Sequence, residues 1–236
     1  GDMTVFINYA LVIADPVQQL ARTISNFIAT QANIERVSAL MERPALITDT
    51  PEVIEKYGTS FEPKRENWEP ITGRITFDDV TFRYPDGTEN VLEHFSLDIP
   101  AGTTVAIVGE TGAGKSTLVN LVPRFYDATA GAVRLNGVDV RDMEQAALRA
   151  QIGYVPQKGV LFSGTIASNI RYGREDADDK AVLEALDCAQ ASEFVSELPD
   201  GAENPITQGG TNVSGGQKQR LAIARALVRK APVYIF

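Results

Sequence analysis

The sequence has a single cysteine, Cys188, a single histidine, His94, and a shortage of positive charge. One cysteine excludes a disulfide framework and is typical of a reducing compartment such as the cytosol, where a lone thiol is usually a small core residue. With 22 Lys and Arg against 31 Asp and Glu, the net charge is −9. Nucleic-acid contacts need clustered basic side chains to replace counterions, so we expect no nucleic-acid partner. The length of 236 residues, 44% of them hydrophobic, predicts one large globular domain or one domain with an appendage.

One apolar stretch, Val5–Ala14, is too short to cross a bilayer by itself. It stops at Asp15-Pro16, and ten helical residues rise only about 15 Å against a hydrocarbon core of about 30 Å. Composition leaves three interpretations open for this stretch: a buried helix, a strand, or the last turns of a membrane helix that begins outside the sequence.

Apolar residues recur after Pro16 at spacings of three, four or seven, with polar residues between them, and the pattern stops before Pro44. This period predicts an amphipathic helix, and an ordinary surface helix packed on a core is one interpretation of it. Residues 44–72 hold four prolines and no sustained period, which predicts a linker or an extended arm. The apolar positions of the predicted helix are Val17, Leu20, Ile24, Phe27, Ile34, Val37 and Met41.

A globular domain is expected to begin near Gly73, where apolar and polar residues start to alternate. The alternation from Ile75 to Tyr84 has one extra position at Asp78-Asp79, which predicts a strand with a bulge. A second alternating segment spans residues 91–99, and the apolar run at residues 104–108 is suited to a buried strand. His94 lies in this early β-region, and we interpret it as structural.

The predicted buried strand leads directly into Gly109–Ser116, which matches the P-loop or Walker A pattern G-x-x-x-x-G-K-[ST], and residues 118–125 behind it are expected to be helical. The glycines allow successive backbone N–H groups to face inward and form an anion site. Lys115 would supply a point charge to the β- and γ-phosphates, and the Ser116 hydroxyl would bind Mg²⁺. The local charge allows an acidic protein to hold a polyanion.

Two further residues are candidates for the same site. Tyr84 lies 25 positions before Gly109, where its ring would stack on a purine, although it would be interpreted as a core or turn tyrosine without the P-loop. Gln157 follows an apolar strand at residues 152–156, and its amide oxygen would face Mg²⁺ or the attacking water.

A second helix start of the same kind occurs at Val213–Gln217, which reads Val-Ser-Gly-Gly-Gln, before an expected helix at residues 218–228. Ser214 is a small hydroxyl cap, and the glycines leave backbone N–H groups bare at the positive end of the helix dipole. Residues 213–236 carry five basic residues and no acidic one. Two phosphate-binding helix starts in one compact domain cannot easily hold one nucleotide, and a head-to-tail dimer resolves this difficulty.

Together these motifs resemble the nucleotide-binding domain of an ABC transporter, and residues 161–170 (LFSGTIASNI) resemble its exporter branch. The resemblance implies an α/β fold with a P-loop core, an antiparallel β-subdomain and a helical subdomain at about residues 165–215 that carries the signature Val213–Gln217. It implies three regions: residues 1–43 as the end of the last transmembrane helix and its cytoplasmic extension, 44–72 as a linker, and 73–236 as the ATP-binding domain. It also favours the membrane-helix interpretation of Val5–Ala14.

The resemblance further implies that ATP and Mg²⁺ bind between the P-loop of one subunit and the signature of another, with Ser214 and Gly216 contacting the γ-phosphate in trans. Lys115 and Gln157 are the expected catalytic residues, Ser116 and Gln157 the expected Mg²⁺ ligands, and the Gln157 loop would transmit closure to the transmembrane part. Residues 207–211 resemble a segment that touches the partner's membrane helices. The expected ATP-contacting residues are Tyr84, Gly109, Glu110, Thr111, Gly112, Ala113, Gly114, Lys115, Ser116, Thr117, Ser214, Gly215, Gly216 and Gln217.

The function that the resemblance implies is ATP-driven export at the cell membrane, with the ATP-binding domain on the cytoplasmic face and a second subunit that is identical or different. The alternatives are a hydrolysis-deficient half of a heterodimeric transporter and a soluble ABC-type ATPase. The family's Mg²⁺-binding aspartate, catalytic glutamate and switch histidine are expected beyond Phe236. We therefore expect this chain alone to bind ATP weakly without turning it over.

Overall fold

The computed structural model describes residues 2–43, 45–59 and 61–236 of the chain. It divides into two compact units, residues 1–46 and 47–236, and each is described by itself.

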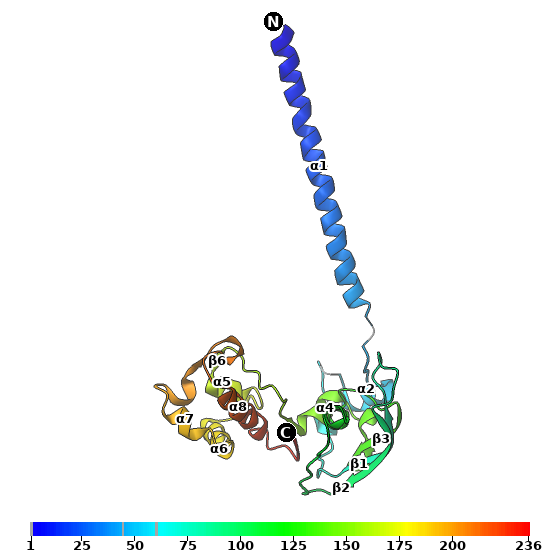
Figure 1. Ribbon diagram of the computed structural model, residues 1–236, viewed down its shortest axis with the longest axis vertical. Helices are drawn as coiled ribbons and strands as arrows, with labels where there is room; N and C mark the ends of the chain where they lie inside the picture. Colours follow the sequence, from blue (N-terminus) through cyan, green and yellow to red (C-terminus); the bar gives the residue numbers. More distant parts are fainter. Residues whose placement is uncertain (1, 44, 60) are drawn as a thin grey trace. The chain divides into compact units, whose positions relative to one another are not determined.

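The first unit is one long helix, α1, Asp2–Met41, which continues through Pro16 (Figure 1). It ends at Met41, and thus before residue 44 as predicted. The strand interpretation of Val5–Ala14 is wrong, because the backbone there is helical. Most side chains of that stretch lie outside the described residues. Among the residues that the structure describes, no helix combines the length and the apolar character needed to cross a membrane.

The segment 47–72 contains two short helices in the part of the chain expected to be a linker. Helix α2, Pro51–Tyr57, begins where the Thr50 hydroxyl accepts a hydrogen bond from the Val53 N–H and where proline occupies the first helical position. The 3₁₀ helix η1 spans Arg65–Asn67. Val53 and Tyr57 are buried, so this segment adds to the second unit's core.

An antiparallel sheet forms one part of the second unit, with the strand order β2-β1-β3-β4. Its strands are β1 Ile75–Phe82, β2 Leu92–Ile99, β3 Ala130–Leu135 and β4 Val138–Asp139. The predicted bulge is confirmed, because the register of β1 shifts between Phe77 and Val80 and leaves both side chains buried. His94 has a ring nitrogen, Nδ1, 2.9 Å from an Asp79 carboxylate oxygen at this bulge, which fits a structural role.

A glycine in β3, Gly131, and one in the turn after it, Gly137, give a matched stability test. Gly131 has φ +77°, and a Cβ there would overlap the carbonyl oxygens of Asp78 and Asp79, whereas Gly137, with φ +86°, faces open space. Both alanine variants carry the cost of a left-handed backbone, about 1–2 kcal/mol, and only Gly131→Ala adds a clash. We expect Gly131→Ala to lower the free energy of unfolding by about 3 kcal/mol or more and Gly137→Ala by about 1 kcal/mol, as measured by urea denaturation. Equal losses of unfolding free energy in the two variants would contradict the close approach of Gly131 to the bulge at Asp78 and Asp79.

The core of this part lies between the sheet and the helices α3, Lys115–Leu121, and α4, Gln145–Ala150. The parallel pair β5, Ile152–Tyr154, and β8, Val233–Ile235, packs beside them, and Ile152 pairs with Val233. Phe77, Phe82, Leu118, Leu121 and Leu148 are among the buried members of this core.

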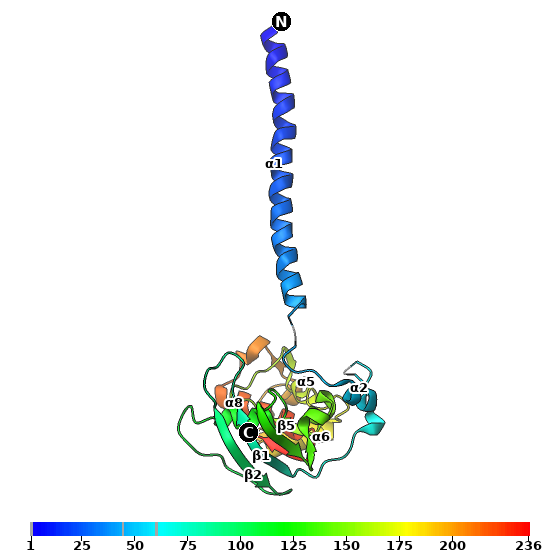
Figure 2. The same ribbon diagram turned by 90° about the vertical axis from the view of Figure 1, so that its right-hand side faces the viewer.

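A second core holds the helices that follow β5, which gather together in Figure 1; Figure 2 gives the view turned by 90°. The expected helical region from about residue 165 to 215 contains α5, Ile166–Arg171, α6, Asp179–Cys188, and α7, Ser192–Ser196. Helix α8, Gly215–Leu227, packs against α5 and α6. The remaining elements are β6 Gly164–Thr165, β7 Pro205–Ile206 and the 3₁₀ helices η2 Val140–Asp142, η3 Gly201–Glu203 and η4 Gln208–Gly210.

Three sequence predictions need correction. Thr104–Val108 is not a buried strand: it pairs with no described strand, and Val108 is 91% exposed. A parallel strand needs bonded neighbours and cover on both faces, and this segment has neither among the described residues. The helix predicted at residues 118–125 instead begins at Lys115 and ends at Leu121, because Pro123 has no N–H to continue the helical hydrogen bonds and Arg124 has a left-handed backbone. Cys188 is exposed, since other residues form the buried face of α6.

Candidate functional site

The loop Gly109–Gly114 leads directly into α3; its residues are exposed up to Ala113, and Gly114 is buried. Gly112 and Gly114 have φ of +88° and +81°, a conformation that side-chain-bearing residues rarely adopt. A Cβ on Gly114 would also lie 3.1 Å from a Val91 methyl group, so the loop passes close to the start of β2. Glycine is required at position 114 for both reasons.

The Lys115 ammonium group points back into this loop. Its Nζ donates hydrogen bonds to the carbonyl oxygens of Gly109, at 2.8 Å, and Glu110, at 2.6 Å. The loop therefore closes around a positive charge at the start of α3. Ser116, the next residue, is exposed, and Thr117 is buried.

Tyr84 lies beside the helix that carries Lys115. Its hydroxyl is 2.8 Å from the Thr117 hydroxyl, and its ring packs edge to face on Phe82 and Tyr126 at centroid distances of 4.9 and 5.2 Å. Tyr84 is partly buried. The structure brings it to the P-loop helix and also makes it part of an aromatic cluster.

Gln157 is exposed in the bend that follows β5. The same strand contacts the P-loop helix, since the Tyr154 hydroxyl donates a 3.0 Å hydrogen bond to the Asn120 side-chain oxygen. Further along this loop, a Cβ on Gly159 would lie 3.0 Å from the Lys218 carbonyl oxygen in α8. The loop from Gln157 therefore runs from α3 towards α8.

Ser214 and Gln217 form a capping box at the start of α8. The Ser214 hydroxyl accepts a hydrogen bond from the Gln217 N–H at 3.2 Å, and the Gln217 side chain accepts one from the Ser214 N–H at 2.8 Å. The predicted hydroxyl cap is confirmed. Gly215 and Gly216 are exposed, and a Cβ on either would meet nothing within 4 Å. Packing within the described chain therefore does not explain why these positions are glycine, although glycine is about 1 kcal/mol less favourable than alanine in a helix.

A comparison with protein-family models matches residues 92–236 to the family described as "ABC transporter". The chain belongs to the ABC transporter family.

Relatives and solved structures agree with this membership. The ATP-dependent lipid A-core flippases of Desulfotalea psychrophila and Chromohalobacter salexigens are 39% and 42% identical over 235 residues, and these matches cover 100% of this chain and 39% and 38% of the relatives. The putative multidrug export ATP-binding/permease protein YgaD of Bacillus subtilis is 38% identical, with 100% and 38% coverage. A bacterial Atm1-family ABC exporter with ATP bound superposes with a TM-score of 0.75 at 36% identity, over 87% of this chain and 34% of the exporter. The chain thus spans about two fifths of the length of the curated relatives.

Arg225 of this ABC domain joins α8 to the loop from Gln157, and sequence reasoning missed it. Its guanidinium donates to the Val160 carbonyl oxygen at 2.9 Å, and to the carbonyl and side-chain oxygens of Asn169 at 3.0 and 2.9 Å. It also lies over the rings of Phe162 and Tyr172. Burial lowers the pKa of Arg225 from its usual value. An arginine inside the apolar pattern of the predicted helix was the available signal.

The Arg225 contacts predict a measurable loss on conservative replacement. Arg225→Lys keeps the charge but cannot reproduce three planar hydrogen bonds, so we expect the free energy of unfolding to fall by about 2–3 kcal/mol in urea denaturation. The control is Arg220→Lys in the same helix, because Arg220 is exposed and donates one bond, to the Gln190 carbonyl oxygen. We expect a change below about 0.5 kcal/mol for the control. Similar losses in both variants would contradict the role of Arg225.

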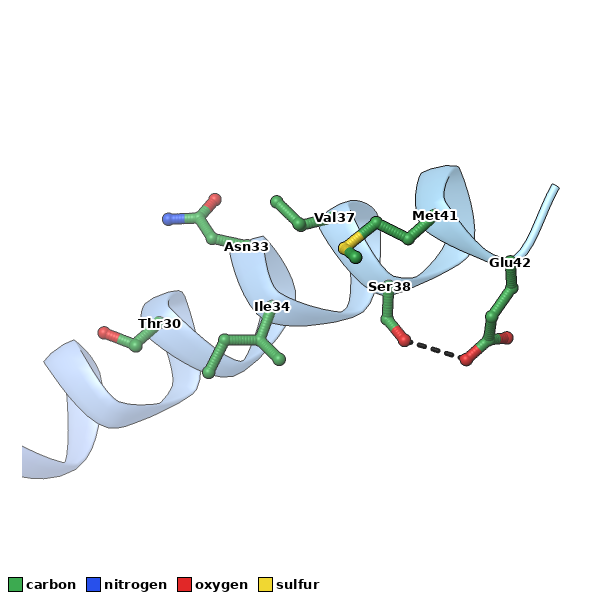
Figure 3. A pocket seen from close by; sticks show the side chains of 7 residues that line it. All are labelled: Thr30, Asn33, Ile34, Val37, Ser38, Met41 and Glu42. Atoms are coloured by element: carbon green, nitrogen blue, oxygen red, sulfur yellow. Dashed lines mark hydrogen bonds between the residues drawn. The ribbon is translucent and has the colours of Figure 1, made fainter. Parts of the chain in front are cut away.

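The hollow on α1 in Figure 3 is not part of this site. It lies on one helix of the first unit and is lined by polar and apolar side chains, with a Ser38–Glu42 hydrogen bond of 2.9 Å on its edge. Among the described residues, no cationic side chain or glycine-rich loop lines it. Its lining residues are Thr30, Asn33, Ile34, Val37, Ser38, Met41 and Glu42.

Proposed function

We propose that this chain is an ATP-binding part of an ABC exporter and that it binds Mg²⁺-ATP between its own P-loop and the signature of a second subunit. The observation that carries the proposal is the Lys115 ammonium group enclosed by the loop Gly109–Gly114. Phosphate oxygens of a nucleotide would replace the two carbonyl oxygens as its partners. Tyr84, fixed beside Thr117, would bind the base.

The metal would be held by the hydroxyl oxygen of Ser116 and the amide oxygen of Gln157, with phosphate oxygens and water as its further ligands. Oxygen donors suit Mg²⁺, which usually keeps several waters and takes few protein ligands. Bound there, the metal would neutralise charge on the β- and γ-phosphates. Within the described residues, no group of three or more His, Cys, Asp or Glu side chains is placed to hold a metal ion.

The signature is proposed to act on the nucleotide of the second subunit. Two observations support this: Gly215 and Gly216 face open space, and the Ser214 hydroxyl, which accepts a bond from Gln217, still has its own proton to donate. The γ-phosphate of the opposite subunit's ATP would accept a hydrogen bond from that hydroxyl and further hydrogen bonds from backbone N–H groups at the start of α8. A homodimer and a heterodimer both satisfy this geometry.

Nucleotide-driven closure is proposed to reach a transmembrane part through the loop from Gln157. Arg225 and the close approach of Gly159 to Lys218 tie this loop to α8, so movement of the signature helix would move the loop. The whole protein would couple ATP hydrolysis to export across a membrane, with this domain on the cytoplasmic face. The names of its relatives, lipid A-core flippases and a putative multidrug export protein, favour export.

The chain alone is proposed to bind ATP without turnover, because no Asp or Glu follows Glu203 in the sequence to orient water or complete the metal site. The test is a titration of the purified chain with a fluorescent ATP analogue and Mg²⁺, alongside a phosphate-release assay. We expect saturable binding that ATP competes away and no hydrolysis above the buffer rate. Absence of binding would overturn the proposed function, and hydrolysis that disappears in Lys115→Ala would overturn the claim of no turnover.

A further inference from the structure

The turn that follows the P-loop helix contains Arg124, whose side chain is buried and whose backbone is left-handed. Arg124 is only 2% exposed, and its backbone has φ +52°, a left-handed conformation that costs a non-glycine residue about 1–2 kcal/mol. Glycine would fit this backbone without that cost. The side chain of Arg124 must therefore make contacts that stabilise the turn or connect it to other elements.

Those contacts reach a segment far away in the sequence. Arg124 Nη1 lies 2.8 Å from an Asp49 carboxylate oxygen, and Nη2 donates to the Thr48 carbonyl oxygen at 3.0 Å. The Asp49 side chain is only 11% exposed and also accepts a 3.4 Å hydrogen bond from the Gln145 N–H at the start of α4. Residues 47–50, which we name the arm, are thus bonded to the rest of the second unit at Thr48 and Asp49.

The guanidinium also binds a carboxylate of its own turn. Arg124 Nε donates to Asp127 at 2.8 Å, and Nη1 lies 3.4 and 3.5 Å from the carbonyl oxygens of Arg141 and Met143. One buried cation therefore has two carboxylate partners, one local and one in the arm. A buried charge that loses its partners is costly, so the arm and the turn stabilise each other's position.

The same turn is bonded directly to the helix that begins with Lys115. The Arg124 N–H donates to the Leu121 carbonyl oxygen at 3.1 Å, and the Phe125 N–H donates to that of Asn120 at 3.0 Å. From the other side, Arg149 in α4 donates to the carbonyl oxygens of Pro123 and Arg124. Helix α3 has seven residues, about 10 Å of rigid backbone between the phosphate-binding loop and this turn.

We propose that Arg124 is a positioning residue that couples nucleotide occupancy of the P-loop to the arm through its ion pair with Asp49. The proposal rests on the proposed function, because it requires ATP to bind at Lys115. When phosphate oxygens replace the Gly109 and Glu110 carbonyl oxygens as partners of the Lys115 ammonium group, the loop and the first turn of α3 become ordered around the phosphates. The other end of α3 holds the turn of Arg124, so the arm becomes ordered as well.

The test is hydrogen exchange of the full 236-residue chain with and without Mg²⁺-ATP, read at the loop 109–117 and at residues 47–57. We expect ATP to slow exchange of backbone amides in both segments, with a change of about tenfold in the arm. Asp49→Asn is expected to keep the slowing at residues 109–117 and to lose it at residues 47–57. Asp127→Asn is the matched control, since it removes the same charge from the same guanidinium but leaves the arm attached, and it is expected to keep both effects.

The outcomes separate this inference from the function on which it rests. Slowing at residues 109–117 with an unchanged arm in the unmodified chain would overturn the coupling and leave ATP binding intact, and this measurement needs no variant to fold. Loss of arm slowing in Asp127→Asn as well as in Asp49→Asn would also overturn it, because Arg124 would then serve only local stability. No response in either segment, with no ATP bound, would overturn the proposed function together with the inference.

Discussion

Lys115→Ala is expected to weaken binding of Mg²⁺-ATP by this domain by about 10²–10⁴-fold. Charge-assisted hydrogen bonds contribute about 1.5–3 kcal/mol each, and Lys115 has two acceptors in the loop, at Gly109 and Glu110, that phosphate oxygens would replace. The remaining backbone N–H groups of the loop cannot supply the lost positive charge. Competition titration against a fluorescent ATP analogue measures the effect.

The control for this variant is Lys180→Ala, which removes a lysine with an 83% exposed side chain from α6. It has the same effect on net charge, so a general electrostatic contribution would appear equally in both variants. We expect ATP affinity within about twofold of the unmodified chain for Lys180→Ala. An unchanged affinity in Lys115→Ala would contradict the assignment of the P-loop as the nucleotide site.

Gly216→Val is expected to reduce ATP-dependent association of two domains by about 100-fold without destabilising the fold. A Cβ at Gly216 meets nothing within the chain, and valine has a higher helix propensity than glycine. In the proposed dimer the same position faces the γ-phosphate of the opposite nucleotide. A branched side chain there would displace the backbone N–H donors, and the loss of hydrogen bonds to a charged group, at about 1.5–3 kcal/mol each, corresponds to about 100-fold weaker association.

Gly216→Ala is the graded comparison, because it adds one methyl group at the same position. Light scattering with and without Mg²⁺-ATP should give the association order glycine, alanine, valine. Thermal unfolding and ATP affinity of the separate domain should stay the same in all three proteins, since the P-loop is unchanged. Association of the valine variant equal to that of the unmodified chain would be evidence against a signature that acts in trans.

The sequence predicted well those features that depend on local chemistry. The extra position at Asp78-Asp79 predicted the bulge of β1, because a break in an alternating pattern can place side chains on one face only if the backbone absorbs a residue. Ser214 predicted its own cap, because a hydroxyl before a helix accepts a bond from a free backbone N–H, and the structure adds the Gln217 side chain, which completes a capping box. The glycines of the P-loop predicted a curled backbone, and the structure adds that Gly112 and Gly114 have positive φ.

The sequence analysis missed, or predicted wrongly, the features that depend on residues far away in the chain. The burial of Thr104–Val108 was predicted from its apolar composition, but a strand also requires neighbours that composition does not reveal. Arg124 looks like an ordinary surface arginine in the sequence, and only its place within an apolar pattern distinguishes Arg225. Their acceptors, Asp49 in one case and Val160 and Asn169 in the other, lie 56 to 75 residues away, and only folding brings them together.

The bulge of β1 also limits how the length of this strand can vary in evolution. Phe77 before the bulge and Val80 after it face the same core, so the two halves of the strand differ in pleat phase by one residue. Deleting one residue elsewhere in Ile75–Phe82 would turn one end of the strand over and bring buried side chains to the surface, whereas deleting the extra residue at positions 78–79 would only restore a regular alternation. Insertions and deletions among related domains should therefore fall at the bulge or in the turn between β1 and β2, at residues 83–91, and should spare the rest of Ile75–Phe82.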